Sequence, residues 1–210
     1  MWRISALVLC ILGTATQLPA ESAEDFYERG KHEFESGSYE AAIADCTRAI
    51  QANPNFAPAY RGRAAAKGLT HDLDGAIADL SEAIRLDPKD VKAYSNRSVA
   101  KLSKGDADGA LADCVKAIAL KPDFAEGYFH LGNIKFAKDD FDGAIASYDE
   151  AIRLNSSYAE AYNNIAAAYN SLGEWDQGIQ AGLQAVRLKP DYQLARNNLA
   201  WARAQKARSK

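Results

Sequence analysis

Residues that build catalytic and metal sites are scarce in this chain. Its 210 residues include only 3 histidines and 3 cysteines, and no two cysteines form a CxxC pair. The histidines stand far apart, at His32, His71 and His130. No HExxH motif, phosphate-binding loop or nucleophile elbow is present. The sequence therefore predicts no metal site and no cofactor, and we expect the protein not to be an enzyme.

Long hydrophobic runs and an excess of positive charge are also missing. The longest apolar run, ISALVLCILG at 4–13, is much shorter than the ~20 residues that a membrane-spanning helix needs. The formal net charge is −3 at pH 7, which argues against nucleic acid as the main partner. We therefore expect neither nucleic-acid binding nor a stable membrane span once the N-terminal segment is removed.

The N-terminal segment has the order of regions that is typical of a secretory signal peptide. Arg3 gives a short basic start, the apolar run follows, and residues 14–20 are small and polar and include Pro19. We predict that 1–20 is a signal peptide, with cleavage after Ala20 and with Ala15 and Ala23 as the alternative cleavage sites, the latest at 23. The protein is then exported, to the periplasm in a bacterium and otherwise out of the cell as a secreted protein.

Proline is uncommon too, with 6 residues, but its spacing is regular. Pro54, Pro88, Pro122 and Pro190 follow a period of 34 residues, and Ser156 occupies the remaining place in the series. A fixed period in this range indicates a repeat array. Proline cannot continue a helix, and it disfavours a helical residue before it. Each of these prolines is therefore expected to lie between helices.

Aromatic and small residues recur with the same period. Counted from residue 23, position 4 of each unit is aromatic, positions 8 and 20 are small, and position 27 is alanine. Small residues let two helices approach closely, while large apolar residues fill the space between them. Turn sequences such as GSY at 37–39 and GDA at 105–107 recur in mid-unit and predict a helix end there. The expected helix–turn–helix units are 23–56, 57–90, 91–124, 125–158 and 159–192.

These features resemble the tetratricopeptide repeat (TPR) family, which has the same period and the same pattern of small, aromatic and proline residues. The resemblance covers 23–208. It implies an all-α fold, a right-handed α-α superhelix (solenoid) of about five helix–turn–helix repeats plus a C-terminal capping helix at 193–208. It also implies a non-catalytic scaffold for protein binding, with a protein or peptide held in the concave groove.

In this family the first helix of each unit lines the groove, mainly with positions 2, 5, 6 and 9. Asparagine recurs at these positions, and its amide offers a donor and an acceptor that can pair with a peptide backbone. Ordinary solvated asparagines on a helix surface are the alternative. An aromatic residue on the same face is either an apolar anchor for a partner or packed against the neighbouring helix. The candidate groove residues are Asn96, His130, Asn133, Asn163, Asn164, Asn197, Asn198, Arg61, Lys92 and Phe129.

Some members of the family clamp a C-terminal carboxylate with lysine, asparagine and arginine from three units. The stretch YSNRS at 94–98 resembles the second of these units, and Arg61 can replace the first lysine. Glu126 and His130 stand where the clamp needs positive charge, and a frame that uses Lys92 breaks at other positions. Each lost charge-assisted hydrogen bond costs about 1.5–3 kcal/mol. We therefore expect no such clamp.

Two further residue types recur at fixed positions. Cys46 and Cys114 both occupy position 24, two units apart, which is too far for the ~7 Å limit between the Cα atoms of a disulfide. We expect two buried thiols and no disulfide. Aspartate recurs at position 23, and we expect these carboxylates to lie on a solvated helix face; they are Asp45, Asp79 and Asp113.

The sequence thus predicts an exported, non-catalytic adaptor that binds an extended peptide or a partner protein in its concave groove. The alternative is a structural assembly factor of an envelope complex, which uses its convex face or its basic C-terminal helix. The identity of the partner has no signature in the sequence.

Overall fold

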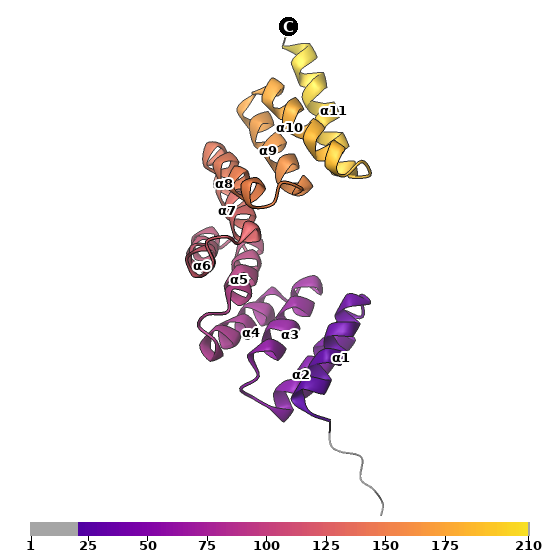
Figure 1. The fold of residues 1–210 in the computed structure, drawn as a ribbon, viewed down its shortest axis with the longest axis vertical. Helices are drawn as coiled ribbons and strands as arrows, with labels where there is room; N and C mark the ends of the chain where they lie inside the picture. Colours follow the sequence, from indigo (N-terminus) through magenta and orange to yellow (C-terminus); the bar gives the residue numbers. More distant parts are fainter. Residues whose placement is uncertain (1–20, 210) are drawn as a thin grey trace, which may run out of the picture.

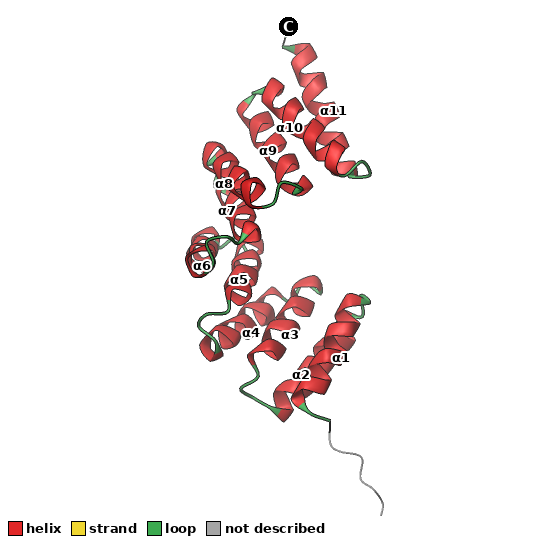
Figure 2. Cartoon of the chain, in the orientation of Figure 1, coloured by secondary structure: helices red, strands yellow, loops and turns green. Residues whose placement is uncertain are grey.

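The computed structural model describes residues 21–209, which form helices joined by short loops, with no strand in this part of the chain (Figure 2). The predicted signal peptide at 1–20 lies outside the described residues. The helices are α1 (Ala23–Glu35), α2 (Tyr39–Ala52), α3 (Ala57–Leu69), α4 (Leu73–Leu86), α5 (Val91–Ser103), α6 (Ala107–Leu120), α7 (Ala125–Ala137), α8 (Phe141–Leu154), α9 (Ala159–Leu172), α10 (Trp175–Leu188) and α11 (Gln193–Arg208).

Consecutive helices pair, and the pairs stack along one direction. Each helix packs against the next one in the chain, and each odd-numbered helix also contacts the following odd-numbered helix. Figure 1 shows the result, an elongated superhelical array with α1 at one end and α11 at the other. The prediction of an all-α superhelical repeat fold is confirmed. We call each pair of helices a unit and the interface between two consecutive units a joint.

Small residues at positions 8, 20 and 27 allow the helices of each unit to pack closely. The alanine at position 27 is fully buried in every unit, and the residues are Ala49, Ala83, Ala117, Ala151 and Ala185. The clearest case of close approach is Gly132 at position 8 of the fourth unit. A Cβ atom there would lie 2.4 Å from the ring of Tyr148, which fills position 24. In the fourth unit the missing side chain at position 8 therefore makes room for the large ring at position 24.

The turn inside each unit depends on one residue with a left-handed backbone. Position 15 has a positive φ in all five units, and it is occupied by Gly37, His71, Gly105, Asp139 and Gly173. Glycine adopts this conformation without strain, while histidine and aspartate do so at a cost. Asp72, Asp106 and Asp140 follow in three of the turns, and each side chain accepts a hydrogen bond from the backbone N–H three residues later. That bond caps the second helix of the unit.

The aspartates at position 23 are buried, so the prediction of a solvated face is wrong. Asp45, Asp79 and Asp113 are only 3–5% exposed. Each pairs with the arginine at position 7 of its own unit, 16 residues earlier in the chain; these arginines are Arg29, Arg63 and Arg97. The two hydrogen bonds from each guanidinium satisfy the carboxylate that burial would otherwise leave uncompensated.

Both cysteines of the described residues are buried free thiols. The Cys46 sulfur on α2 lies close to the backbones of α1 and α3. A Cβ atom added at Gly30 on α1 or at Gly62 on α3 would be 3.1–3.2 Å from it. The Cys114 thiol donates to the Gly127 carbonyl over 3.2 Å. Burial raises the pKa of Cys46 to about 11 and that of Cys114 to about 12. Both sulfurs are therefore protonated and unreactive at neutral pH.

Candidate functional site

A continuous groove runs along the first helices of the units. Its first hollow, of about 370 Å³, extends from Phe34 on α1 to His130 on α7. A smaller hollow of about 120 Å³ shares His130 and Val99 with the first. The third hollow, of about 340 Å³, shares Asn133 with the second and ends at Asn198 on α11. Because neighbouring hollows share lining residues, we treat them as one surface and call it the groove.

Four asparagines of the groove are joined in a chain of hydrogen bonds. The Asn198 amide donates to the Asn163 oxygen over 2.9 Å, and the Asn163 amide donates to Asn164 over 3.1 Å. Asn164 donates in turn to Asn133 over 2.9 Å. The Tyr148 hydroxyl also donates to the Asn133 oxygen, at 2.8 Å. The predicted asparagines at these positions therefore lie together across the third hollow.

The hydrogen bonds fix what each end of this chain still offers to a ligand. Two donors occupy the Asn133 oxygen, so its NH₂ group is the part left to bind an external acceptor. At the other end the Asn198 oxygen receives no bond from the described residues and can accept one. Asn163 is only 2% exposed, and its amide links Asn198 to Asn164 within the row of hydrogen bonds. The groove thus presents an oriented row of neutral donors and acceptors.

Asn96 and His130 lie in the first hollow, apart from the asparagine chain. The Ser95 hydroxyl and His130 Nδ1 are 2.9 Å apart, and Ser95 is buried. Burial lowers the pKa of His130, although the charge of Glu126 opposes the shift. The ring is therefore neutral at pH 7. The rest of this hollow is mostly apolar and includes two exposed side chains, Leu69 and Val99.

The other predicted site residues do not line the groove. Arg61 pairs with Asp90, with 2.9 Å between Nε and Oδ2, and Lys92 lines a separate hollow beside the loops between units. The Phe129 ring stacks on Tyr158 at 4.8 Å between centroids. The Asn197 amide oxygen accepts a hydrogen bond from Gln193 on the exposed side of α11. Phe129 follows the alternative in which the aromatic residue packs against a neighbouring helix.

Tyr148 is a groove residue that the sequence did not identify as a ligand-facing group. It belongs to the core position 24, and its ring is buried at 1% exposure, yet its hydroxyl reaches the end of the asparagine chain. The available signal was the glycine at position 8 of the same unit, Gly132, whose missing side chain gives the tyrosine ring its space.

Neither a metal site nor a membrane span is present in the part of the chain that the structure describes. Histidine, cysteine and acidic side chains do not gather there in groups of three or more that could hold a metal ion. None of α1 to α11 combines the length and the apolar character that a membrane crossing needs.

Comparison with known proteins identifies the repeats. Family models described as tetratricopeptide repeat match residues 70–124 and 159–192, and a model described as TPR repeat matches 132–173. No curated protein sequence matches the chain.

Solved structures share the fold at low sequence identity. TTC0263, a TPR protein of Thermus thermophilus, is 21% identical with a TM-score of 0.73, over 86% of this chain and 98% of its own. Cut9 with Hcn1, from an APC/C hetero-tetramer, has 21% identity and a TM-score of 0.81, over 88% of this chain and 37% of that chain. The first TPR domain of Spaghetti (RPAP3), bound to an HSP90 peptide, is 27% identical with a TM-score of 0.55, over 56% of this chain and 93% of its own. The period, the paired helices and the matching family models together show that this chain is built from tetratricopeptide repeats.

Proposed function

We propose that this protein is a non-catalytic, exported adaptor that binds an extended segment of a partner protein in the groove. The observation that carries the proposal is the chain of hydrogen bonds from Asn198 through Asn163 and Asn164 to Asn133. TPR domains generally mediate protein–protein interaction, and the Spaghetti domain, similar over part of this chain, has been solved with a peptide. Both facts support a peptide as the ligand.

The chemistry of the groove favours recognition of the peptide backbone. A main chain in extended form alternates N–H donors and C=O acceptors, which asparagine amides can pair with at the same time. The hydrogen bonds between the amides hold them in place before a ligand arrives, so that less side-chain entropy is lost on binding. The NH₂ group of Asn133 and the oxygen of Asn198 then act as a donor and an acceptor at the two ends of the third hollow.

The first hollow supplies the apolar part of such a site. Leu69 is 51% exposed and Val99 is 41% exposed, and both line this hollow beside Phe34. An apolar side chain of the partner placed here would bury these groups, and buried apolar anchors carry much of the energy of most interfaces. The neutral ring of His130 adds no charge to the hollow at pH 7. The preferred ligand is therefore an uncharged segment that combines an apolar side chain with a free main chain.

Binding can be tested with peptides selected from a random library displayed on phage, with the full chain as bait. The variant Asn133→Ala/Asn164→Ala/Asn198→Ala removes the amides along the third hollow. Calorimetry should show that it binds the selected peptides at least about tenfold more weakly, because several hydrogen bonds are lost together. Asn197→Ala is the matched control. It removes an asparagine amide of α11, the helix of Asn198, but outside the groove, and it should leave binding unchanged. Equal affinity of the triple variant and the unaltered protein would refute the proposal.

Export rests on the order of regions in residues 1–20, and it has a separate test. The chain should be expressed with a C-terminal tag, and the N-terminus of the recovered protein should be determined by mass spectrometry. Recovery from the periplasm or the medium with a start at Glu21, or as late as Glu24, supports export. A cytoplasmic protein that retains Met1 contradicts it and leaves the groove proposal intact.

A further inference from the structure

Two joints of the array hold an arginine side chain in the same way. The Arg97 guanidinium donates to Asp113 over 2.7 and 2.8 Å and to the Ser81 hydroxyl of the preceding unit over 3.0 Å. It also lies over the ring of Tyr94, at 5.7 Å from the centroid. One unit earlier, Arg63 makes the corresponding contacts with Asp79, Thr47 and Tyr60. The arginine is at position 7, the carboxylate at position 23, the hydroxyl at position 25 of the preceding unit and the ring at position 4.

The joint between the fourth and fifth units keeps only part of this arrangement. Tyr162 provides the ring at position 4, but Ile165 replaces the arginine at position 7 and Ala181 replaces the carboxylate at position 23. Position 25 of the preceding unit is Asp149, so the acceptor is retained and is now an acid. In the joints on either side, position 25 of one unit and position 7 of the next are both apolar. The two residues are Val115 and Leu131 in the preceding joint, and Leu183 and Leu199 in the following one. Asp149 opposite Ile165 is thus an acid without its cation.

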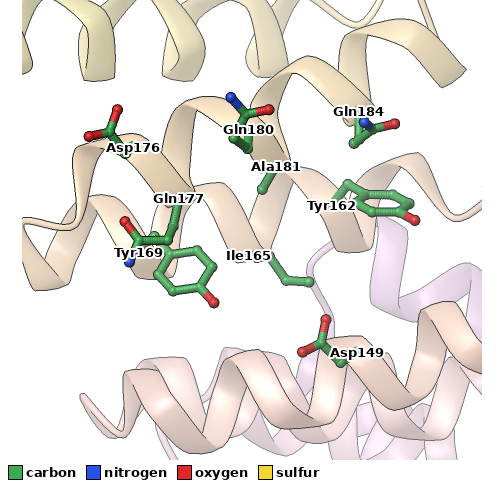
Figure 3. A pocket seen from close by; sticks show the side chains of 9 residues that line it. All are labelled: Asp149, Tyr162, Ile165, Tyr169, Asp176, Gln177, Gln180, Ala181 and Gln184. Atoms are coloured by element: carbon green, nitrogen blue, oxygen red, sulfur yellow. The ribbon is translucent and has the colours of Figure 1, made fainter.

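A pocket of about 440 Å³ lies at this joint, between α8, α9 and α10 (Figure 3). The Asp149 carboxylate points from α8 toward Ile165, and the rings of Tyr162 and Tyr169 lie on either side of Ile165 in this view. No side chain of the described residues forms a hydrogen bond or an ion pair with Asp149. The second acid of the pocket, Asp176, is paired with Lys206. Among the acids of the pocket, Asp149 is therefore the one that is open to a cation from outside.

Asp149 is exposed to solvent, but the side chains packed around it still disfavour its charge in the absence of a partner. Desolvation by the neighbouring side chains raises the pKa of Asp149 above its usual value. The same carboxylate acts on Tyr169, where burial raises the pKa first and the charge of Asp149 adds to the shift. A cation in this pocket would oppose both shifts, because a positive charge nearby favours the ionised form of the carboxylate and of the tyrosine.

We propose that this pocket binds an arginine side chain of a partner protein, in the place where the array itself supplies an arginine at two earlier joints. The guanidinium would lie between the Asp149 carboxylate and the face of Tyr162, with its aliphatic stem against Ile165 and Ala181. Gln180 and Gln184 on α10 also line the pocket, and their amide oxygens can accept further N–H bonds. None of the lining residues of this pocket belongs to the groove, so the site is separate from the peptide site proposed above.

The chemistry of the pocket favours arginine over lysine. A guanidinium is planar, weakly hydrated and rich in donors, so it can bind a carboxylate and stack on an aromatic ring at the same time. A lysine ammonium is a compact and strongly hydrated charge that loses more on leaving water. Two tyrosine rings, one free carboxylate and several amide oxygens are the groups that a guanidinium can use together. Its apolar stem also matches the isoleucine that replaces the internal arginine.

Three short peptides test this directly, with the full chain and the chemical shifts of its backbone amides in NMR as the readout. The probes are acetyl-Gly-Arg-Gly-amide, the same peptide with citrulline, and the same peptide with lysine. Citrulline keeps the shape of arginine but has a neutral urea group. We expect the arginine peptide to shift the amides of α8, α9 and α10, and the citrulline peptide to bind at least about tenfold more weakly. Equal binding of citrulline, or of lysine, overturns the assignment to arginine.

Variants locate the site and separate binding from folding. Asp149→Asn should weaken binding of the arginine peptide by about tenfold or more and leave the melting temperature unchanged or raised, because the carboxylate has no partner to lose. Asp123→Asn is the matched control, since it changes the net charge equally at an exposed residue outside the pocket and should bind normally. Ile165→Arg/Ala181→Asp rebuilds the internal pair of the earlier joints and should abolish binding by occupying the pocket. Unchanged binding in Asp149→Asn, or the same loss in Asp123→Asn, would overturn the proposal.

Discussion

Replacing Arg97 with leucine tests how much the buried charge pair inside a unit contributes to stability. In the folded protein the Arg97 side chain is 17% exposed and that of Asp113 is 7% exposed, with 2.7 Å between Nη2 and Oδ1. The substitution Arg97→Leu leaves Asp113 buried with one remaining cation, Lys101, at 2.7 Å. The carboxylate then keeps its desolvation cost but has lost its two guanidinium bonds.

The expected loss of stability follows from these contacts. Removing one partner of a buried ion pair costs about 3–5 kcal/mol. Arg97 is still partly exposed and Lys101 still compensates the charge of Asp113, so we expect a smaller loss than that range, about 2–3 kcal/mol. Urea unfolding followed by circular dichroism measures this loss. The amides of α5 and α6 should also exchange their hydrogens faster in the variant, because a repeat array can open locally before the whole chain unfolds.

The double variant Arg97→Leu/Asp113→Ser provides the control, because it gives the third unit the residues of the fourth, Leu131 and Ser147. Lys101 keeps its contact with the Gly109 carbonyl, as Lys135 does with Gly143 in the fourth unit. We expect the double variant to regain most of the lost stability, since replacing both partners of a buried pair is often close to neutral. A single variant as stable as the unaltered protein, or losses that simply add, would refute this reasoning.

The pH dependence of the same pair has a definite sign. Desolvation alone would raise the pKa of Asp113, but the hydrogen bonds from Arg97 and Lys101 outweigh it, and the pKa lies below its usual value. A carboxyl group with a lowered pKa stabilises the fold above its unfolded pKa of about 3.9 and loses that contribution as the pH falls further. The difference in stability between the unaltered protein and Arg97→Leu should therefore shrink as the pH is lowered from 6 to 3.

The fold could be predicted because the period restricts every residue in turn. Prolines at one phase, small residues at positions 8, 20 and 27, and turns in mid-unit all point to the same paired helices, and such agreement between local signals is what specifies a structure. The gap at Ser156 does not interrupt the array. Asn155 accepts a hydrogen bond from the backbone N–H of Ser157, as Asn53 does from Asn55 at the turn that has a proline. The side chain of the residue before the proline position thus supports the turn in both cases.

The aspartates were predicted wrongly because each recurring position was considered by itself. At position 23 the carboxylates repeat one whole unit apart, which alone indicates a solvated face. The relevant signal joins two positions, since arginine at position 7 and aspartate at position 23 occur together in three units and are both absent from the last two. A pair that appears and disappears together indicates spatial contact. Each of the first three units therefore contains a buried ion pair, and the last two units have apolar packing and the Asp149 pocket in its place.

The asparagines show a limit of a different kind. Their phase on the helices is visible in the sequence, but two of their three hydrogen bonds depend on distances of about 3 Å between side chains of different units. Asn164 reaches Asn133 across a joint, while Asn96 has no asparagine one unit away on either side and lies beside His130. Arg61 and Phe129 were on suitable positions too, but nearby partners hold both of them. Phase alone cannot decide whether a side chain faces a ligand or its own neighbour.

Two further predictions concern the geometry of the units. Gly132→Ala should cost about 1–3 kcal/mol of stability in urea unfolding, because the new Cβ atom would lie 2.4 Å from the Tyr148 ring. Gly68→Ala is the control and should cost nothing, since its Cβ atom would have no packing neighbour within 4 Å beyond the adjacent backbone of its own helix. Asp139→Gly should stabilise the protein by up to about 1 kcal/mol, because residue 139 has a φ of 58° that glycine adopts without strain. The gain is a difference between two effects. Glycine removes the steric strain of the left-handed backbone but adds conformational freedom to the unfolded chain. Residue 139 lies in the turn after α7, where the chain needs a left-handed residue and glycine is the usual one, so we expect the relief of strain to be the larger effect. The reverse change at the equivalent position, Gly105→Ala, should therefore lower the midpoint of urea unfolding, and a rise in that midpoint would contradict the assignment of strain to position 15.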